Sequence, residues 1–167
     1  MTTADDDFKM HGAGNTPEFS LDGLETAARV VSLYDGDTVK VVFRLFCGYR
    51  KFSVRLAGID ACEIRAKDPR NRDLAARARD RLIELVSGEK PGPGWKKKDV
   101  DKLLDDRVAL VWLRCRSFDK WGRVLADVFP CEKAPKSFSD VLLEEKLAYR
   151  YEGGTKLSEE EERFRIV

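Results

Sequence analysis

The chain has 167 residues, which is enough for one domain with a sizeable core. Its formal net charge is only +1. Residues 1–26 carry six acidic side chains and one basic one, whereas residues 27–157 carry 28 basic and 20 acidic side chains. A basic body suits a polyanionic partner, because lysine and arginine placed on phosphates release counterions, although a solvated surface can show the same balance. No apolar run approaches the roughly 18 residues of a membrane span, so no membrane association is expected.

The four cysteines are widely spaced and form no Cys-x-x-Cys pair, which argues against a zinc site. The chain begins with Met1 and shows no signal peptide, so we expect free thiols and a cytoplasmic or otherwise intracellular protein. We also expect a monomer. The cysteines are Cys47, Cys62, Cys115 and Cys131.

The single histidine, His11, lies in the N-terminal tail rather than in the body of the chain. This placement excludes imidazole bases, histidine-ligated zinc and Ser-His-Asp triads from the body. Any general base there must be a carboxylate or a metal-bound hydroxide.

The first part of the chain changes from a tail to a strand-rich segment. Residues 1–26 combine Asp5-Asp6-Asp7 with scattered glycine and proline and no periodicity, which predicts a disordered acidic tail. Residues 28–33 are rich in strand formers, and residues 39–46 and 51–56 alternate apolar and polar side chains with period two.

The second part of the chain combines helices with two more strands. An apolar stripe predicts a helix from Asn71 to Val86 that stops at Gly88. Residues 89–106 read as a flexible basic segment with a short helical turn, either an exposed loop or a loop that contacts nucleic acid through Trp95. Residues 108–115 predict a strand buried on both faces, residues 119–123 a hairpin turn and residues 124–129 the returning strand. Two helices are expected at 137–147 and 158–167.

This order of elements predicts an α+β fold that is mainly β. We expect a five-stranded Greek-key barrel of the OB type with about three packed helices. The predicted organisation is a tail at 1–26, the barrel domain at 27–157 and a short C-terminal helix or tail at 158–167.

Three short motifs carry the charged residues that suggest chemistry. They are Asp35-Gly36-Asp37-Thr38, then Arg55-Leu56-Ala57-Gly58-Ile59-Asp60-Ala61-Cys62-Glu63, then Asp119-Lys120-Trp121-Gly122-Arg123. The first two motifs flank the arms of a predicted hairpin, so their charged side chains can converge. Two acidic metal ligands, a further carboxylate and two arginines suit phosphodiester hydrolysis. Each motif alone has an ordinary interpretation as a turn or a helix start.

Together, in this order over about residues 27–152, the three motifs resemble those of the staphylococcal nuclease family. The resemblance implies a calcium-dependent endonuclease that hydrolyses DNA and RNA with little preference for sugar or sequence and leaves 3′-phosphates. It implies single-stranded or locally melted nucleic acid as the substrate.

The resemblance also implies a metal site and a base. Asp37, Asp60 and the main-chain carbonyl of Ala61 would hold Ca²⁺, whose preference for oxygen donors they satisfy. Glu63 would position, and in one view deprotonate, the attacking water.

The phosphate and the nucleotide would be bound by basic and aromatic side chains. Arg55 and Arg123 would bind the phosphate and offset its developing charge. The implied nucleotide contacts are Lys120, Trp121 and either Tyr149 or Tyr151.

One departure from the family pattern leaves room for other functions. Ala61-Cys62 stands where the family has Thr-Pro, which leaves the loop before Glu63 less preorganised. The alternatives are a non-catalytic module of this fold that binds nucleic acid or protein, and a barrel whose acidic cluster binds calcium for stability alone.

Overall fold

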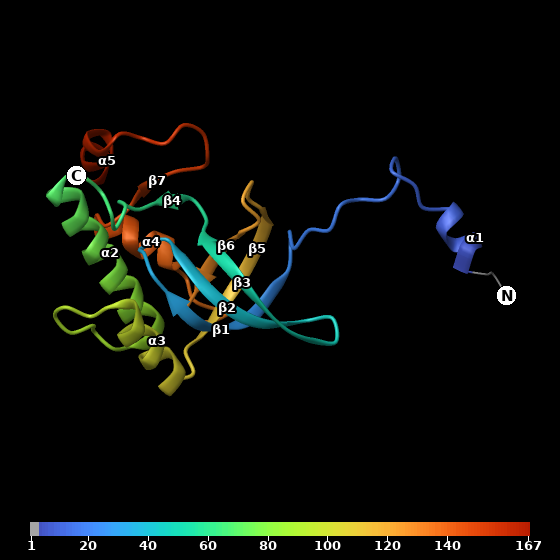
Figure 1. Ribbon diagram of the computed structural model, residues 1–167, viewed down its shortest axis with the longest axis horizontal. Coiled ribbons are helices and arrows are strands. Elements are labelled where there is room, and N and C mark those ends of the chain that lie inside the picture. Colours follow the sequence, from blue (N-terminus) through green and yellow to red (C-terminus); the bar gives the residue numbers. More distant parts are fainter. Residues whose placement is uncertain (1–3) are drawn as a thin grey trace.

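The computed structural model describes residues 4–167, and its centre is a closed five-stranded barrel. The strand order is β1-β2-β3-β6-β5, with β3 and β6 parallel and the other neighbours antiparallel (Figure 1). This confirms the predicted α+β class and an OB-fold-like barrel. The strands are β1 (Glu25–Leu33), β2 (Thr38–Leu45), β3 (Gly48–Leu56), β5 (Leu110–Phe118) and β6 (Val124–Phe129).

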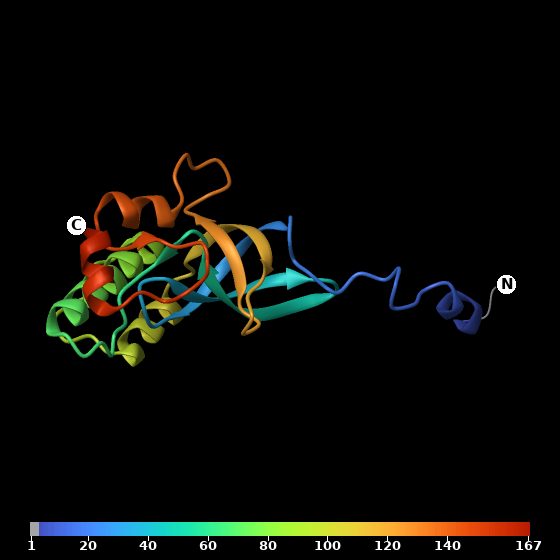
Figure 2. The same cartoon turned by 90° about the horizontal axis from the view of Figure 1, so that it is seen from above.

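Five helices accompany the barrel among the described residues, where about three were expected. The larger helices lie together at one end of the barrel, on the side away from the N-terminal arm (Figures 1 and 2). In residues 4–167 no helix is both long and apolar enough to cross a membrane. The helices are α1 (Ala4–Lys9), α2 (Pro69–Ser87), α3 (Lys97–Asp106), α4 (Phe138–Glu144) and α5 (Glu159–Ile166).

The N-terminal tail, which we expected to be disordered, contains one short helix. Helix α1 has no buried residue and stands away from the barrel on an extended arm (Figures 1 and 2). Packing begins at Leu21, which is buried, and the Gly23 N–H donates to the Cys115 carbonyl at 2.9 Å. The folded body therefore starts before residue 27. Residues 1–3 of the predicted tail lie outside the described residues.

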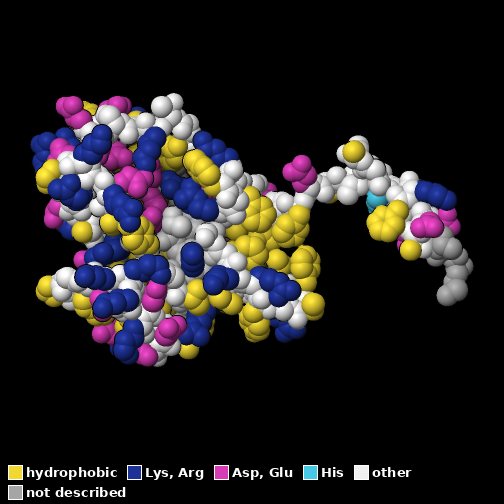
Figure 3. Space-filling view, in the orientation of Figure 1, with side chains coloured by type: hydrophobic (Ala, Val, Ile, Leu, Met, Phe, Trp, Pro, Cys, Tyr) yellow, Lys and Arg dark blue, Asp and Glu magenta, His cyan; other side chains and the backbone are white. Residues whose placement is uncertain are grey.

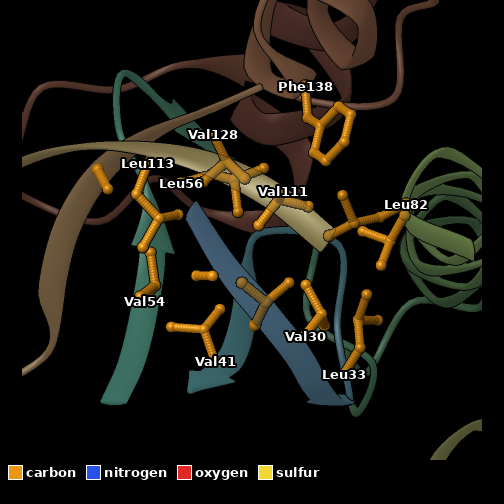
Figure 4. Close-up of a cluster of buried hydrophobic side chains, with 14 of the residues drawn as sticks. Val30, Leu33, Val41, Val54, Leu56, Leu82, Val111, Leu113, Val128 and Phe138 are labelled. Atoms are coloured by element: carbon orange, nitrogen blue, oxygen red, sulfur yellow. The ribbon is translucent and has the colours of Figure 1, made fainter. Parts of the chain in front are cut away.

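The apolar side chains of the alternating strands fill the interior of the barrel, as the sequence predicts. Val41 of β2, Val54 of β3 and Leu113 of β5 are fully buried and point into the same cluster (Figure 4). Leu82 of α2 and Phe138 of α4 pack on this cluster from the helical end of the barrel. The hydrophobic core thus continues from the barrel into the helices.

Two expectations about the middle of the chain are wrong. Strand β5 is not buried on both faces, because Leu110 is 58% exposed while Val111 and Leu113 are buried. Residues 97–106 are not a loop, since α3 buries Val100, Leu103 and Leu104 in the core.

Trp95, just before α3, is not a freely exposed ring. This side chain is partly buried and packs on the hydrophobic core. It is therefore not free to stack on a nucleic-acid base, as the loop interpretation required.

The helix ends follow local capping chemistry. Gly88 ends α2 at a φ of 75° and donates its N–H to the Glu84 carbonyl. Ser137 and Ser158 cap α4 and α5 with capping boxes, which confirms both predicted helix starts.

Two unpredicted short strands complete the fold beside the barrel. Strand β4 (Ile59–Asp60) pairs with β7 (Tyr149–Arg150) in an antiparallel ribbon. This ribbon brings the second motif next to the C-terminal part of the chain.

Helix α2 packs directly on the turn between β1 and β2. A Cβ atom placed on Gly36 would lie 2.6 Å from the Ala78 Cβ, well inside van der Waals contact. We predict that Gly36→Ala lowers the free energy of unfolding by about 1–3 kcal/mol, because the helix must move away from the turn. Urea unfolding measures the change. Gly14→Ala is the control, since a Cβ there meets nothing within 4 Å, and equal midpoints for the two variants would contradict the prediction.

Candidate active site

An open cleft of about 1040 Å³ lies where the ends of β3 and β4 meet the β5–β6 turn. It collects side chains from the second and third sequence motifs and from the loop after β7, whereas no residue of the first motif lines it. Asp37, Ala61 and Tyr149 do not line it and are buried. Seven of the predicted site residues line this cleft: Arg55, Asp60, Glu63, Lys120, Trp121, Arg123 and Tyr151.

Arg55 connects the first two motifs. It pairs in register with Thr38 across the β2–β3 hairpin, which sets its side chain beside the first acidic turn. Its Nη2 donates to Asp60 Oδ1 at 2.8 Å and to the Ile59 carbonyl at 3.3 Å. Its Nη1 lies 3.6 Å from Asp37 Oδ2. One half-buried guanidinium thus faces two buried carboxylates.

The first acidic turn is organised by its own side chains. Asp35 Oδ1 accepts the Thr38 N–H at 2.9 Å, which closes the turn. Asp37 Oδ1 accepts the Thr38 hydroxyl at 3.0 Å, and Asp37 Oδ2 accepts the Ala61 N–H at 3.0 Å. This last bond ties the first motif to the second across the end of the barrel.

The pKa values of the two carboxyl groups shift in opposite directions. Burial, followed by the nearby Asp35, raises the pKa of Asp37 to about 8. Burial alone would also raise the pKa of Asp60, but hydrogen bonds with Asp37, Arg55 and Tyr149 outweigh it and lower that pKa. At neutral pH the Asp37 carboxyl therefore holds a proton and Asp60 is ionised.

This donor set fits a hard divalent cation. Two buried carboxylates and the main chain of Ala61 offer oxygen donors of the kind that calcium prefers. A bound cation would replace the proton on Asp37 and relieve the crowding of negative charge. Within residues 4–167, no group of three or more His, Cys, Asp or Glu side chains is arranged for metal binding. The set named here contains only two such side chains.

Glu63 lies at the exposed edge of the cleft. Its carboxylate forms an ion pair with Lys156, from the loop after β7, and both side chains are more than half exposed. Lys156 was not predicted, because it belongs to none of the motifs. The ion pair holds Glu63 and Lys156 together at the edge of the cleft.

The β5–β6 turn presents the third motif as one unit. Asp119 Oδ1 accepts the N–H groups of Trp121 and Arg123, both at 2.9 Å, and Asp119 Oδ2 accepts Arg123 Nε at 2.7 Å. Trp121 is 71% exposed, with Lys120 Nζ at 4.3 Å from its ring centre. Asp119 thus orients Arg123, a role that sequence reasoning did not assign although the residue stood in the motif.

The structure separates the two candidate tyrosines. Tyr149 is 2% exposed, and its hydroxyl donates to Asp60 Oδ2 at 2.7 Å. It is therefore wrong as a nucleotide contact. Tyr151 lies past the end of β7 and lines the cleft, with the Arg55 guanidinium 5.7 Å from its ring centre.

A buried polar network behind the cleft was missed at the level of sequence. Glu162 of α5 is 2% exposed, with Oε1 at 3.3 Å from the Tyr149 hydroxyl. Its Oε2 accepts Asn71 Nδ2 at 3.0 Å. Glu162 stands within a run of four glutamates that looks solvent-exposed, so only its spacing of four from buried Ile166 pointed inward.

Comparison of the chain with protein-family models returns no match, and comparison with curated proteins returns none either.

The Asp37 carboxyl should make stability depend on pH when no metal is present. Its pKa of about 8 in the folded chain exceeds the ordinary 3.8. Between these values the folded chain keeps a proton that the unfolded chain releases. The stabilisation is complete below about pH 4 and is lost as pH rises through 8. In chelator, the free energy of unfolding should fall by about 1 kcal/mol per pH unit between pH 5 and 8.

Asp37→Asn is the matched variant for this titration, because the amide keeps the shape and cannot ionise. Denaturant unfolding in chelator at pH 5, 6.5 and 8 should give a shallower slope for the variant. Parallel slopes for the two proteins would rule out Asp37 as the group that titrates.

Tyr149→Phe should remove a hydrogen bond and keep the buried ring. Asp60 Oδ2 would lose a donor in a buried site, so we expect a loss of about 1–3 kcal/mol in the free energy of unfolding. Tyr151→Phe is the control, since its hydroxyl donates only to the Gly154 carbonyl at an exposed position, and it should change stability by less than about 0.5 kcal/mol. Thermal or urea unfolding compares them, and equal losses would mean that the bond to Asp60 contributes nothing.

Proposed function

We propose that this chain is a calcium-dependent nuclease of the staphylococcal nuclease type. It would hydrolyse phosphodiester bonds in single-stranded or locally melted DNA and RNA and leave 3′-phosphates, acting as a monomer. The observation that carries the proposal is the cleft itself. Charged residues from the second and third motifs line one cavity, and Asp37 of the first motif lies behind it, 3.6 Å from Arg55 Nη1.

The proposed role of each residue follows from its position in the site. Asp37, Asp60 and the Ala61 carbonyl would hold the calcium ion. When bound, calcium would polarise a phosphate oxygen and help to orient water. Arg55 of β3 and Arg123, just before the neighbouring strand β6, both line the cleft, so together they can bind two oxygens of one phosphate.

The reaction needs one proton acceptor, and Glu63 is an exposed carboxylate that lines the cleft on the same motif as Asp60. In the proposed step, a water oxygen attacks phosphorus while a Glu63 carboxylate oxygen accepts the water proton. The bond from phosphorus to the 5′-oxygen breaks, and the 5′-oxygen leaves and takes up a proton. Arg55 and Arg123 offset the charge that builds on the phosphate oxygens.

The nucleotide itself would be bound at the rim of the cleft. Trp121 offers an exposed ring for stacking on a base, and Lys120 beside it offers a charge for phosphate. Tyr151 supports the Arg55 guanidinium from one side.

A non-catalytic nucleic-acid-binding module is the second candidate. The observation that favours it is that Arg55, Arg123 and Glu63 all have partners inside the protein. A site neutralised in this way binds phosphate only after these pairs open. Binding without cleavage in the presence of calcium would establish this alternative.

We predict that Arg55→Ala lowers kcat for cleavage of single-stranded DNA roughly 100- to 1,000-fold, since it removes a donor to the developing charge. Glu63→Gln should lower kcat roughly 100-fold or more, because the amide accepts no proton at neutral pH. A time course of cleavage of a labelled oligonucleotide in calcium, with quenched samples, measures kcat for the two variants.

The matched control is Arg77→Ala, which removes an exposed arginine of α2 outside the cleft and should leave kcat unchanged. Circular dichroism establishes that each variant is folded. Wild-type activity in both site variants would refute this assignment of the active site.

A further inference from the structure

The outer face of the β2–β3 hairpin joins the cleft to the hairpin tip. Side chains alternate between the two faces of a strand, so the residues that flank Val41 and Val54 along their strands point away from the barrel. Arg55, at the cleft end, therefore shares its face with Lys51 and Tyr49 farther along β3. The cross-strand pairs on this face are Thr38–Arg55, Lys40–Ser53, Val42–Lys51 and Arg44–Tyr49.

This hairpin is entirely basic in its charged residues. Residues 38–56 contain five lysine or arginine side chains and no aspartate or glutamate. Arg44 and Lys51 are exposed, and neither forms an ion pair with any residue in 4–167. Basic and hydrophobic side chains adjoin one another over the hairpin in the space-filling view (Figure 3). In contrast to the arginines of the cleft, these cations are available to an anionic partner.

Exposed aromatic rings lie at the tip of the same hairpin. Tyr49 is 70% exposed and Phe46 is 78% exposed. Phe46 also has a φ of 56°, a left-handed conformation that a bulky residue rarely adopts. Glycine or asparagine would suit this turn better, and the only ring contact of Phe46 among residues 4–167 is with Phe19, at 6.1 Å between ring centres.

We propose that this surface, the hairpin track (Arg44, Phe46, Tyr49 and Lys51), binds the part of a single-stranded nucleic acid that extends beyond the cleft. The inference rests on the proposed function, because the strand would pass from the cleft onto the track. Cations that hold phosphates beside rings that stack on unpaired bases are the features that such a strand needs.

The dimensions suit several nucleotides. Tyr49 lies six residues before Arg55 on β3, which corresponds to about 20 Å at roughly 3.3 Å per residue. Barrels of the OB type bind about 4–16 nucleotides of single strand. An anionic membrane would also attract cations and rings, but it would meet the tip alone and would not use a stripe that begins in the cleft.

The test compares short and long oligonucleotides in chelator, where binding is measured without cleavage. Fluorescence anisotropy with labelled (dT)3 and (dT)12 gives the ratio of their affinities and its salt dependence. Wild type should prefer (dT)12. Arg44→Gln/Lys51→Gln should reduce the salt slope for (dT)12 by about 1.4, because each lost phosphate contact removes about 0.7 from the slope on single strands.

Tyr49→Ala should weaken (dT)12 binding by roughly tenfold with an unchanged salt slope, because it removes stacking and no charge. Two controls match these variants in chemistry. Arg77→Gln/Lys133→Gln removes two exposed cations elsewhere, and Phe164→Ala removes an aromatic ring that is 86% exposed on α5. Both controls should keep the preference of wild type for (dT)12.

The outcomes separate this inference from the proposed function. If wild type binds (dT)3 and (dT)12 equally, or the track variants keep the full preference, the track is refuted while the nuclease proposal stands. If wild type binds neither oligonucleotide and cleaves nothing in calcium, both fall. If the track variants lose binding to phosphatidylserine vesicles but bind (dT)12 as tightly as wild type, the hairpin binds a membrane and the proposed track is refuted.

Discussion

The arrangement of the site depends on the guanidinium of Arg55, which lies between two buried carboxylates. Asp37 comes from the turn before β2, and Asp60 comes from β4. Without the arginine these carboxyl groups would face one another with no compensating charge. Taking an ion pair out of water costs free energy, so the cluster contributes little to net stability. What it gives is geometry, because one side chain fixes the relative positions of two loops.

The protein supports this cluster from behind with a second layer of polar contacts. The Tyr149 hydroxyl bonds to Asp60, and buried Glu162 connects the same region to α5 and to Asn71 of α2. Residues after 149 thus contribute to a site whose motifs lie before 124. Contacts of this kind hold ligating carboxylates in a fixed orientation and tune their affinity for metal. The C-terminal helix is in this sense part of the site.

Much of the fold could be predicted from the sequence, because the signals are local. The alternation of apolar and polar residues predicted β2 and β3 and the strand face that carries Arg55. The capping serines predicted the starts of α4 and α5. These features depend on neighbouring residues alone, so they can be predicted without knowledge of tertiary contacts. The resemblance to the staphylococcal nuclease family, and not a local signal, implied the seven residues that line one cleft.

The features that sequence reasoning missed depend on contacts between distant segments. Strands β4 and β7 have two residues each, which is too short for any periodicity. Tyr149 and Tyr151 look equivalent in sequence. Because β7 ends at Arg150, Tyr149 is buried in the strand whereas Tyr151 lies beyond it and lines the cleft. Glu162 is buried because Asn71 and Tyr149 provide partners for it. The exposed face of β5 likewise reflects what covers the barrel and not the strand itself.

The most direct test of the account is to identify which phosphodiester bond wild type breaks, and with which metal. A 5′-labelled single-stranded oligonucleotide would be incubated with calcium, with magnesium or with chelator. Treatment of the products with a 3′-phosphatase then shows whether their 3′ ends carry phosphate. The account predicts cleavage in calcium, none in chelator, and products whose mobility changes after the phosphatase. Products with 3′-hydroxyl ends, or equal cleavage in chelator, would contradict it.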